Sequence, residues 1–565
     1  MTNYGASSNF NHGFPTPGPQ SPTGQDVMNH VYFVSNQEWK QIREEEQFDY
    51  IVIGSGFCGL AFVERVLKNN PFAKILLLER GGFFLPEHFQ DLPGPYKKTL
   101  GGLSETFPWS LSLESTKGEY VSWQHGMVPF FGGRSTLWSG WCPRPTKDEL
   151  VNWPEKVVEV LEAYYKEAEA LMNVVPADQI TSTSDEKPIF RHLQQGIQQL
   201  LQNNLDAVPE LTRAIPAPLA VKTAKENDVD FSKFSTPSRL LQLIEKQELL
   251  HAKGQGAKLK VATNCIVSRI IEQGNTATAL YTSRGVLALN KAKLILAMGT
   301  LPPTTLLHNS FPALNNIGTR FTAHFISAIV ARVPKKDYSF YKDLCRLEIG
   351  AFYVAGVEPK LDHEGQFHVQ FTALADADPE INAEVALRNM PDVVATASEE
   401  QLMSSKDHVV FVCAVLGELD YKNSKNSFLK NRGADPTTNV TLNLNLNKND
   451  NKVWDAMDKA TFNMLEDICS PKGANQVEYW DAEQNKWKKT RPKKKEYRVS
   501  GLVHEASTLW MGTDSESVVG LDYRPKGVEN VYVTGASLWP TGASWNPTLA
   551  MVALTQHLAD NLSKD

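Results

Sequence analysis

The chain has 565 residues, of which 42% are hydrophobic and 21% charged, and its formal net charge is −7. That composition is typical of a globular protein, and the length exceeds one ordinary domain, so two or more domains are expected. The small acidic surplus argues against nucleic acid as a partner. Six cysteines without a Cys-x-x-Cys pair indicate neither a disulfide framework nor a zinc site, so the sequence predicts no bound metal.

The first 30 residues are rich in Asn, Ser, Gly and Pro and hold almost no apolar run. This is typical of a disordered or surface-draped arm, which we expect to extend to residue 47. The sequence shows no charged-then-apolar signal peptide, and it contains no apolar run of about 18 residues that would cross a membrane. It therefore favours a cytoplasmic protein with no membrane span.

Residues 48–79 read as a strand, a glycine turn, a helix and a second strand. Phe48 to Ile53 is a short, apolar, β-branched run, as in a buried parallel strand. Residues 54–59, Gly-Ser-Gly-Phe-Cys-Gly, match the pattern G-x-G-x-x-G and open the helix. The second strand, Lys74 to Leu78, ends in Glu79, which follows Gly59 by 20 residues. This arrangement predicts a dinucleotide site.

Each residue of this motif has a physical role in holding an ADP group. Gly54 allows the tight turn, Gly56 lets a pyrophosphate approach the backbone, and Gly59 lets the helix pack closely on the strand. The phosphates would bind the N–H groups at the helix start, and Glu79 would hold the adenosine ribose. The alternative interpretation, a turn with three chance glycines, leaves Glu79 unexplained.

Residues 130–141, FFGGRSTLWSGW, form a second glycine-rich loop. Two adjacent glycines followed by small hydroxyl residues allow a backbone to run close against a flat ring. For this loop taken alone, an ordinary glycine turn between aromatic core segments is an equal alternative.

The middle of the chain predicts helices and then longer strands. Helices are expected at residues 151–172, 185–205 and 237–253, and strands at residues 259–271 and 286–297. The second of these strands belongs with the first βαβ unit, so the nucleotide domain is expected to be discontinuous. Between residues 325 and 430, longer strands predict a largely antiparallel sheet. The basic run 486–498, KWKKTRPKKKEYR, is a candidate localisation signal or anion patch, but a solvated hairpin tip is favoured.

The last 65 residues hold the second informative cluster. Residues 503–512, VHEASTLWMG, come first, and residues 531–537 then form a strand that ends in small residues. Residues 542–550, GASWNPTLA, open a final helix that runs to about residue 562. A strand ending in Gly-Ala before a helix N-terminus offers a second place for the polar chain of a cofactor.

Together these motifs resemble the glucose-methanol-choline (GMC) oxidoreductases, which are FAD-dependent enzymes that oxidise alcohols. Four ordered motifs carry the resemblance from Phe48 to the end of the chain: GSGFCG, GGRSTLW, VHEASTLWMG and GAS…WNPT. The forms GGRSTLW and NPT look most like the pyranose 2-oxidase branch. The resemblance implies an α/β fold with a Rossmann-like FAD-binding domain and an interleaved substrate domain built on a largely antiparallel sheet.

The implied domains alternate along the chain after the polar arm of residues 1–47. The FAD-binding domain would comprise residues 48–150, 241–324 and 500–565, and the last part would hold the catalytic pair. The substrate domain would comprise a helical part at residues 151–240 and a sheet part at residues 325–499.

The resemblance implies that His504 and Asn546 are the catalytic pair. Alcohol oxidation moves a hydride from carbon to the flavin N5 while a base removes the hydroxyl proton. An imidazole suits the base, and an amide NH₂ group suits holding the developing alkoxide. The two residues are 42 positions apart, close to the spacing of the family. The alternatives are a structural histidine and an asparagine that only caps the final helix.

The resemblance also assigns the FAD contacts, first to the ADP half and then to the rest of the cofactor. The residues at the ADP half would be Gly54, Gly56, Gly59, Glu79 and, on the adenine side, Val267. Those along the isoalloxazine would be Gly133, Ser135 and Thr136, and those near the pyrophosphate and pyrimidine ends would be Ala536 and Thr548. The chain departs from the common family pattern at Arg134 and at residues 506–508, which puts flavin contacts in doubt more than the reaction class.

FAD is expected to bind without a covalent bond to the protein. In the pyranose oxidase branch the flavin is often tethered through a histidine in the sequence Ser-Thr-His-Trp. The matching stretch here is Ser135-Thr136-Leu137-Trp138, and leucine has no nucleophilic atom. A tether from Cys142, which follows the same loop, is an alternative that nothing in the motif supports.

The substrate is expected to be a small-molecule alcohol, sugar-like or from secondary metabolism, with oxygen, a quinone or another electron acceptor. Two alternatives stay open: lyase or cyclase chemistry in the same fold, and a flavin-binding relative without catalysis. Retention of His504 and Asn546 argues against the second. Five tryptophans in the motif loops are candidates either for ring stacking with a substrate or for packing: Trp138, Trp141, Trp510, Trp539 and Trp545.

Overall fold

The computed structural model describes residues 24–92, 116–117, 123–124, 127–180, 189–222, 232–361, 365–390, 398–430 and 440–564. Most of the predicted N-terminal arm, residues 1–23, lies outside these ranges. The rest of that arm forms two short helices, α1 (Gly24–Val31) and α2 (Asn36–Glu45). Ser35 caps α2 by accepting a hydrogen bond from the Glu38 N–H while the Glu38 side chain accepts from the Ser35 N–H.

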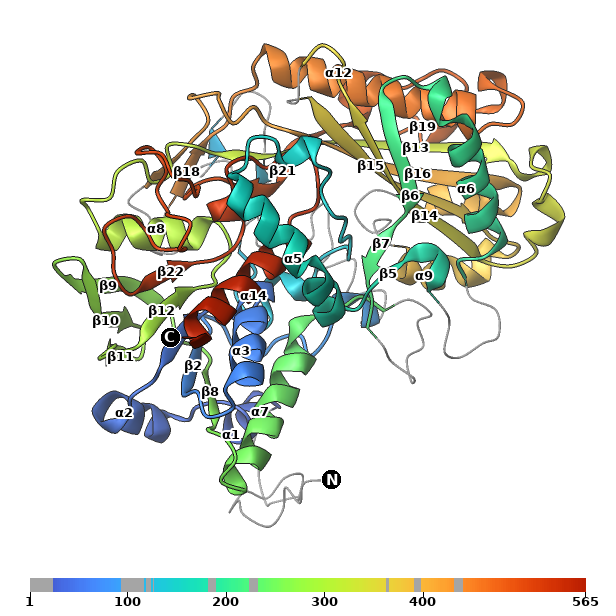
Figure 1. Ribbon diagram of the computed structural model, residues 1–565. Coiled ribbons are helices and arrows are strands. Elements are labelled where there is room, and N and C mark those ends of the chain that lie inside the picture. Colours follow the sequence, from blue (N-terminus) through green and yellow to red (C-terminus); the bar gives the residue numbers. More distant parts are fainter. Residues whose placement is uncertain are drawn as a thin grey trace.

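A five-stranded parallel sheet lies at the base of the molecule, in the order β22-β12-β1-β2-β8. Its strands are β1 (Tyr50–Ile53), β2 (Ile75–Leu78), β8 (Leu259–Ala262), β12 (Lys293–Leu296) and β22 (Val531–Val533). The central strands are apolar throughout and buried on both faces, as parallel strands between two layers must be. Strands from three distant stretches of the chain therefore share one sheet (Figure 1).

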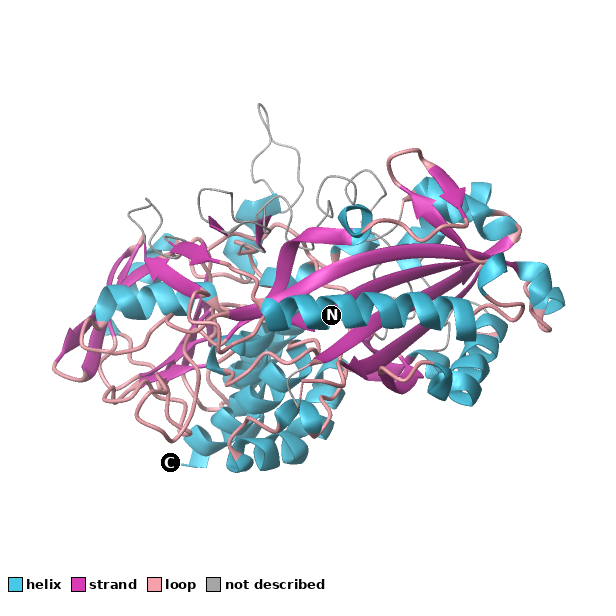
Figure 2. Cartoon of the chain, turned by 90° about the horizontal axis from the view of Figure 1, so that it is seen from above, coloured by secondary structure: helices cyan, strands magenta, loops and turns pink. Residues whose placement is uncertain are grey.

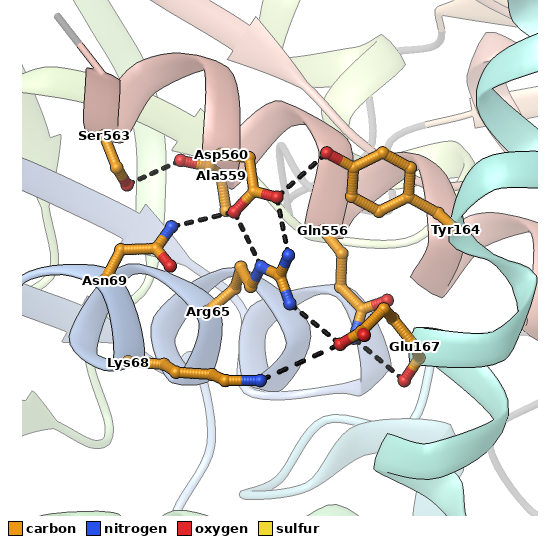
Figure 3. Close-up of polar contacts among 9 residues, drawn as sticks. All are labelled: Arg65, Lys68, Asn69, Tyr164, Glu167, Gln556, Ala559, Asp560 and Ser563. Atoms are coloured by element: carbon orange, nitrogen blue, oxygen red, sulfur yellow. Dashed lines mark hydrogen bonds and ion pairs between the residues drawn. The ribbon is translucent and has the colours of Figure 1, made fainter.

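Helices pack side by side next to this sheet (Figure 1). They are α3 (Phe57–Asn69), α5 (Glu155–Met172), α7 (Thr236–Ala252) and α14 (Thr548–Lys564). Arg65 of α3 donates to both carboxylate oxygens of Asp560 on α14 and to Glu167 of α5 (Figure 3). Tyr164 donates to the same Asp560, so polar contacts tie α3 and α5 to the last helix.

A second, nine-stranded sheet forms the other half of the molecule and is largely antiparallel. Its long strands are β13 (Thr322–Pro334), β14 (Glu348–Val357), β15 (Gln366–Ala375) and β16 (His408–Glu418). Figure 2 shows these strands running side by side. The remaining members are β4 (Trp123–Gln124), β6 (Leu211–Pro216), β19 (Glu478–Asp481), β20 (Lys486–Lys488) and β21 (Arg498–Ala506). Helices α6 (His192–Asn204) and α12 (Lys448–Asn463) pack against it.

The remaining elements are smaller. Two further sheets contain β9 (Val267–Gln273), β10 (Thr276–Thr282) and β11 (Gly285–Ala288), and β3 (Thr116–Lys117), β17 (Ser427–Lys430) and β18 (Val440–Asn443). A third pairs β5 (Val174–Pro176) with β7 (Pro218–Ala220). Other helices are α8 (Leu301–Ser310), α9 (Pro379–Asn389), α11 (Glu399–Met403) and α13 (Lys494–Tyr497). No helix in the described ranges is both long and apolar enough to cross a membrane.

The predicted fold class, α/β with a parallel sheet and a largely antiparallel sheet, is confirmed. Both strands expected at residues 259–271 and 286–297 are interrupted, however. Each gap holds an asparagine in the left-handed conformation, Asn264 and Asn290, both with φ of +52°. Asparagine adopts this conformation more readily than other non-glycine residues, so each apolar run is split by a turn.

Candidate active site

A large cavity opens at the carboxyl ends of the parallel strands. It encloses about 1580 Å³ of empty space, counted out to the solvent at its mouth. Residues that follow β1, β2, β8, β12 and β22 all contribute to its wall, and so do residues of β21 and the start of α14. Ligands of open α/β sheets bind at this edge, because strand ends and helix N-termini meet there.

The glycine turn after β1 forms one side of the cavity. Gly54 has φ of +105°, and a Cβ atom at this position would lie 2.3 Å from the Ala297 carbonyl oxygen. A Cβ atom at Gly59 would lie 2.0 Å from the Gly54 carbonyl oxygen, so Gly59 serves the packing of α3 and does not line the cavity. At Gly56 the nearest atom to an added Cβ is 3.9 Å away. Gly56 thus keeps open a space that a side chain would fill.

Glu79 joins the turn to the end of β2. It is buried, and its Oε2 accepts hydrogen bonds from the N–H and hydroxyl groups of Ser55, while Oε1 accepts from the N–H of Gly81. Burial raises the pKa of this carboxyl group, and these hydrogen bonds oppose the rise. Glu79 lines the cavity and also fixes the shape of the glycine turn.

The second glycine loop contributes backbone rather than hydroxyl groups. Gly133 lines the cavity opposite Gly56, and an added Cβ would come no closer than 3.8 Å to the Gly56 Cα. The Ser135 hydroxyl donates to the Gly132 carbonyl, and the Thr136 hydroxyl donates to the Gly133 carbonyl. Ser135 and Thr136 are buried within the loop and are not part of the cavity wall.

His504 lies on a distorted part of β21. The pairing of β13 with β21 shifts register between His324 opposite Val503 and Thr322 opposite Ala506, which leaves an extra residue on β21. His504 has φ of +60°, unusual for a residue with a side chain. His504 lies in this bulge and is partly exposed to the cavity. Its Nδ1 atom lies 2.9 Å from Nδ1 of His324.

Asn546 lies across the cavity wall, two residues before α14 begins. Its Oδ1 accepts a hydrogen bond of 3.0 Å from Nε2 of Gln370, and that Nε2 is also 3.3 Å from Nε2 of His368. With Oδ1 engaged by Gln370, the amide presents its NH₂ group as the donor for another partner.

Comparison with known families finds a match in the last part of the chain. Residues 423–555 match the family model described as GMC oxidoreductase, and this segment contains both His504 and Asn546. This segment is therefore similar to a domain of the GMC oxidoreductases, and the match supports the family predicted from the motifs. The fold is also similar to the crystal structure of pyridoxine 4-oxidase from Mesorbium loti, with a TM-score of 0.55 and 15% identity over 91% of this chain and 99% of that one. No curated protein sequence matches the chain.

The predicted family is thus confirmed, whereas the pyranose 2-oxidase branch stays a prediction. GMC oxidoreductases bind FAD, and the cavity of this member fits such a group. Gly56, Gly133 and Gly299 all line it, and a Cβ at Gly299 would meet no atom within 4 Å. Val267, Ala536 and Thr548 also line it. In the described residues no group of three or more His, Cys, Asp or Glu side chains could hold a metal ion.

The tryptophans of this GMC oxidoreductase divide into two groups. Trp138 and Trp141 line the cavity. Trp539 and Trp545 stack on each other with ring centroids 5.1 Å apart, and Trp510 packs under the guanidinium of Arg320. The last three therefore belong to the packing of the core.

Sequence reasoning assigned no site role to four residues near the predicted catalytic pair, His504 and Asn546. His324, His368 and Gln370 are buried on long strands of the nine-stranded sheet, and Arg134 pairs with Glu505 at 2.5 Å in the cavity wall. Burial lowers the pKa of His324 to about 4 and lowers that of His368 well below its ordinary value. The sequence did hold a signal for His324, His368 and Gln370, because each is a polar residue within a largely apolar strand. A polar side chain in such a position is rarely buried without a hydrogen-bond partner.

Proposed function

We propose that this GMC oxidoreductase binds FAD in the cavity without a covalent bond and oxidises an alcohol to a carbonyl compound. One observation carries the proposal: His504 and Asn546, which are 42 residues apart, lie on the same cavity as the glycine turn and Glu79. The substrate would be a small-molecule alcohol, sugar-like or a secondary metabolite. Oxygen, a quinone or another acceptor would take the electrons.

His504 is the proposed base for the substrate hydroxyl. Its Nδ1 faces His324, so the imidazole would take the proton at Nε2. A positioned base of this kind contributes about 10²–10⁴-fold to the rate. FAD supplies the hydride acceptor when it is bound.

Asn546 is the proposed donor to the same substrate oxygen. The Gln370 hydrogen bond supports this role, because it orients the amide with its NH₂ group available as a donor. A donor fixed in advance stabilises the negative charge that develops on the oxygen as the proton leaves. Helix α14 begins at Thr548, so a role of Asn546 as the cap alone has less support.

Two observations support a flavin without a covalent tether. Leu137 is fully buried in an apolar cluster with Leu85, Phe89, Val128 and Phe130, and it does not line the cavity. Cys142 does not line it either, and burial raises the pKa of its thiol well above the ordinary value. The thiolate is the nucleophile of cysteine, so this environment disfavours a bond to sulfur.

The test is an anaerobic screen of the purified protein against sugars, glycosides, aryl alcohols and aliphatic alcohols. The proposal expects a flavin absorption spectrum that one class of alcohol bleaches without oxygen, together with formation of the matching carbonyl compound. A flavin that no alcohol bleaches, while a substrate is converted without net oxidation, would instead establish lyase or cyclase chemistry. A protein that binds no flavin would overturn the proposal.

A further inference from the structure

A ring nitrogen of His504 lies within hydrogen-bond distance of a second histidine, His324. Their Nδ1 atoms are 2.9 Å apart, and the two rings meet edge to face with centroids 4.9 Å apart at 84°. A hydrogen bond between two ring nitrogens needs a proton on one and a lone pair on the other. Only one of the two arrangements leaves His504 able to accept a proton at Nε2.

If Nδ1 of His504 carries the proton, Nε2 of the neutral ring has a lone pair and can act as a base. If instead His324 donates to Nδ1 of His504, the neutral His504 carries its proton on Nε2. In that tautomer Nε2 cannot accept the proton of a substrate. The hydrogen bond at one ring nitrogen of a histidine decides which tautomer is present.

The surroundings of His324 keep its ring neutral, so that one of its nitrogens can accept a hydrogen bond. Its side chain is 0% exposed, and burial lowers its pKa to about 4, so the ring is neutral at ordinary pH. The backbone at Gly542 and Ala543 lies against the ring and acts in the opposite direction, favouring a proton on it. Nε2 of His324 is buried and has no hydrogen-bond partner in the described residues, so the direction of the Nδ1–Nδ1 bond is set by the proposed role of His504 as the base.

We infer that His324 is a positioning residue, which accepts a hydrogen bond from Nδ1 of His504 and so keeps the lone pair of His504 on Nε2. This inference rests on the proposed role of His504 as the base. When His504 takes the substrate proton at Nε2, the imidazolium keeps its Nδ1–H bond to the neutral His324. The proton therefore stays on His504, and His324 changes neither charge nor tautomer.

The placement is built into the strands of one sheet. His324 lies on β13, which pairs on one side with β21, the strand that carries His504, and on the other with β16. Other titratable groups around the pair are His368, whose ring lies 6.3 Å from that of His324, Glu418 opposite His324 on β16, and Glu505 next to His504. Groups held by strands keep their geometry more closely than groups held by loops.

The most direct test measures the tautomer of His504 in the wild-type holoenzyme. Histidine is labelled with ¹⁵N in the ring, and the His504 signals are identified by their loss in His504→Gln. We expect a protonated Nδ1 and an unprotonated Nε2. A neutral His504 with its proton on Nε2 would overturn the inference, and this measurement needs no change at His324.

Two variants at His324 give a second readout. Asn at this position keeps an acceptor near the place of Nδ1, whereas Leu removes it. His324→Leu should slow anaerobic flavin reduction at least about tenfold and populate the Nε2–H tautomer; a wrongly set tautomer in a serine protease triad costs about 10⁴-fold. The rate of flavin reduction in His324→Asn should stay within about threefold of the wild-type rate, because the asparagine keeps an acceptor for Nδ1–H of His504.

His408→Asn is the matched control for loss of a partly buried histidine. It lies opposite Pro334 at the far end of β13, ten residues or about 33 Å along the strand from His324. Equal reduction rates and equal tautomers in His324→Leu and His324→Asn would overturn the inference while leaving the base in place. Wild-type reduction in His504→Gln would instead overturn the proposed function itself.

Discussion

Gln370 on β15 donates a hydrogen bond of 3.0 Å to Oδ1 of Asn546, and the same Nε2 group approaches His368. All three side chains are buried at the junction of the nine-stranded sheet and the last helix. Asn546, a proposed catalytic residue, is thus oriented by the antiparallel half of the molecule, and His504 contacts His324 of the same sheet. The two sheets together define the site.

Replacing Gln370 with methionine should keep the volume but release the Asn546 amide. We expect flavin reduction to slow by about 10- to 100-fold, less than the loss of up to about 10³-fold for removal of an oxyanion donor. Gln366→Met, at the partly exposed start of the same strand, is the control and should reduce its flavin at the wild-type rate. Stopped-flow absorbance measures both, and equal rates would remove Gln370 from the orientation of Asn546.

Truncation of Asn546 to alanine separates its two candidate roles. A catalytic donor predicts a large loss of flavin reduction, smaller than that of the His504 change. A purely structural role predicts normal turnover and a lower melting temperature, because the loss of a helix cap lowers the free energy of unfolding by about 1 kcal/mol. Thermal unfolding and single-turnover reduction of the same preparation decide between them.

Alanine at Gly56 and at Gly59 should fail in different ways. Gly56 has φ of −75° and open space around its Cα, so Gly56→Ala should fold normally. Its added methyl group would occupy space in the cavity, so we expect FAD to bind at least about tenfold more weakly, which is about 1.4 kcal/mol of binding free energy. Gly59→Ala would place its Cβ against the Gly54 carbonyl and should destabilise the fold by about 1–3 kcal/mol. Apoprotein melting and flavin titration check both, and unchanged FAD affinity in Gly56→Ala would contradict the cavity assignment.

Glu418 should make the stability of the folded protein depend on pH. Its carboxyl group is enclosed by protein, and burial raises its pKa to about 8, although the Gly542 N–H and the Thr322 hydroxyl donate to it. The folded state therefore holds a proton that the unfolded state releases near pH 4.5, and this stabilisation is lost as pH rises through about 8.

Glu418→Gln keeps an acceptor oxygen and removes this titration. We expect the melting temperature of the wild type to fall relative to this variant between about pH 5 and pH 9. Glu159→Gln, exposed on α5, serves as the control and should follow the wild type. Parallel curves for wild type and Glu418→Gln would exclude the proposed titration.

The flavin should leave the protein on acid precipitation. Leu137 offers no nucleophile, and the thiols that line the cavity, Cys58 and Cys265, both have raised pKa values because burial disfavours the thiolate. Absorbance of the two fractions checks this expectation. Yellow colour in the pellet would show a covalent bond.

Most of the elements that could be predicted from the sequence are ones that local residue patterns determine. The glycine turn, the apolar strands and the final helix could be predicted because each depends on neighbouring residues. The basic run 486–498 could not be placed in this way. The turn of the β19–β20 hairpin precedes it. Within the run, Lys488 pairs with Asp481 of the same hairpin, whereas Arg491 pairs with Glu466 and Arg498 with Asp458, which are 25 and 40 residues away.

The proposed catalytic pair could be taken from motifs, but the residues that contact it could not. His324 and His504 are 180 residues apart, and only the pairing of β13 with β21 brings them together. The contact of Ser135 and Thr136 with the isoalloxazine, which the resemblance implies, stays a prediction. Their hydroxyl groups donate to carbonyl oxygens of their own loop, a local use that the motif did not indicate.

The most direct test of the central claim is single-turnover flavin reduction in His504→Gln. The holoenzyme and the variant are mixed anaerobically with an alcohol that bleaches the wild-type flavin, and absorbance is followed. We expect the variant to keep its FAD and to be reduced at least about 10²-fold more slowly, the scale of a positioned base. Reduction at the wild-type rate, with full FAD content, would contradict the assignment of His504 as the base.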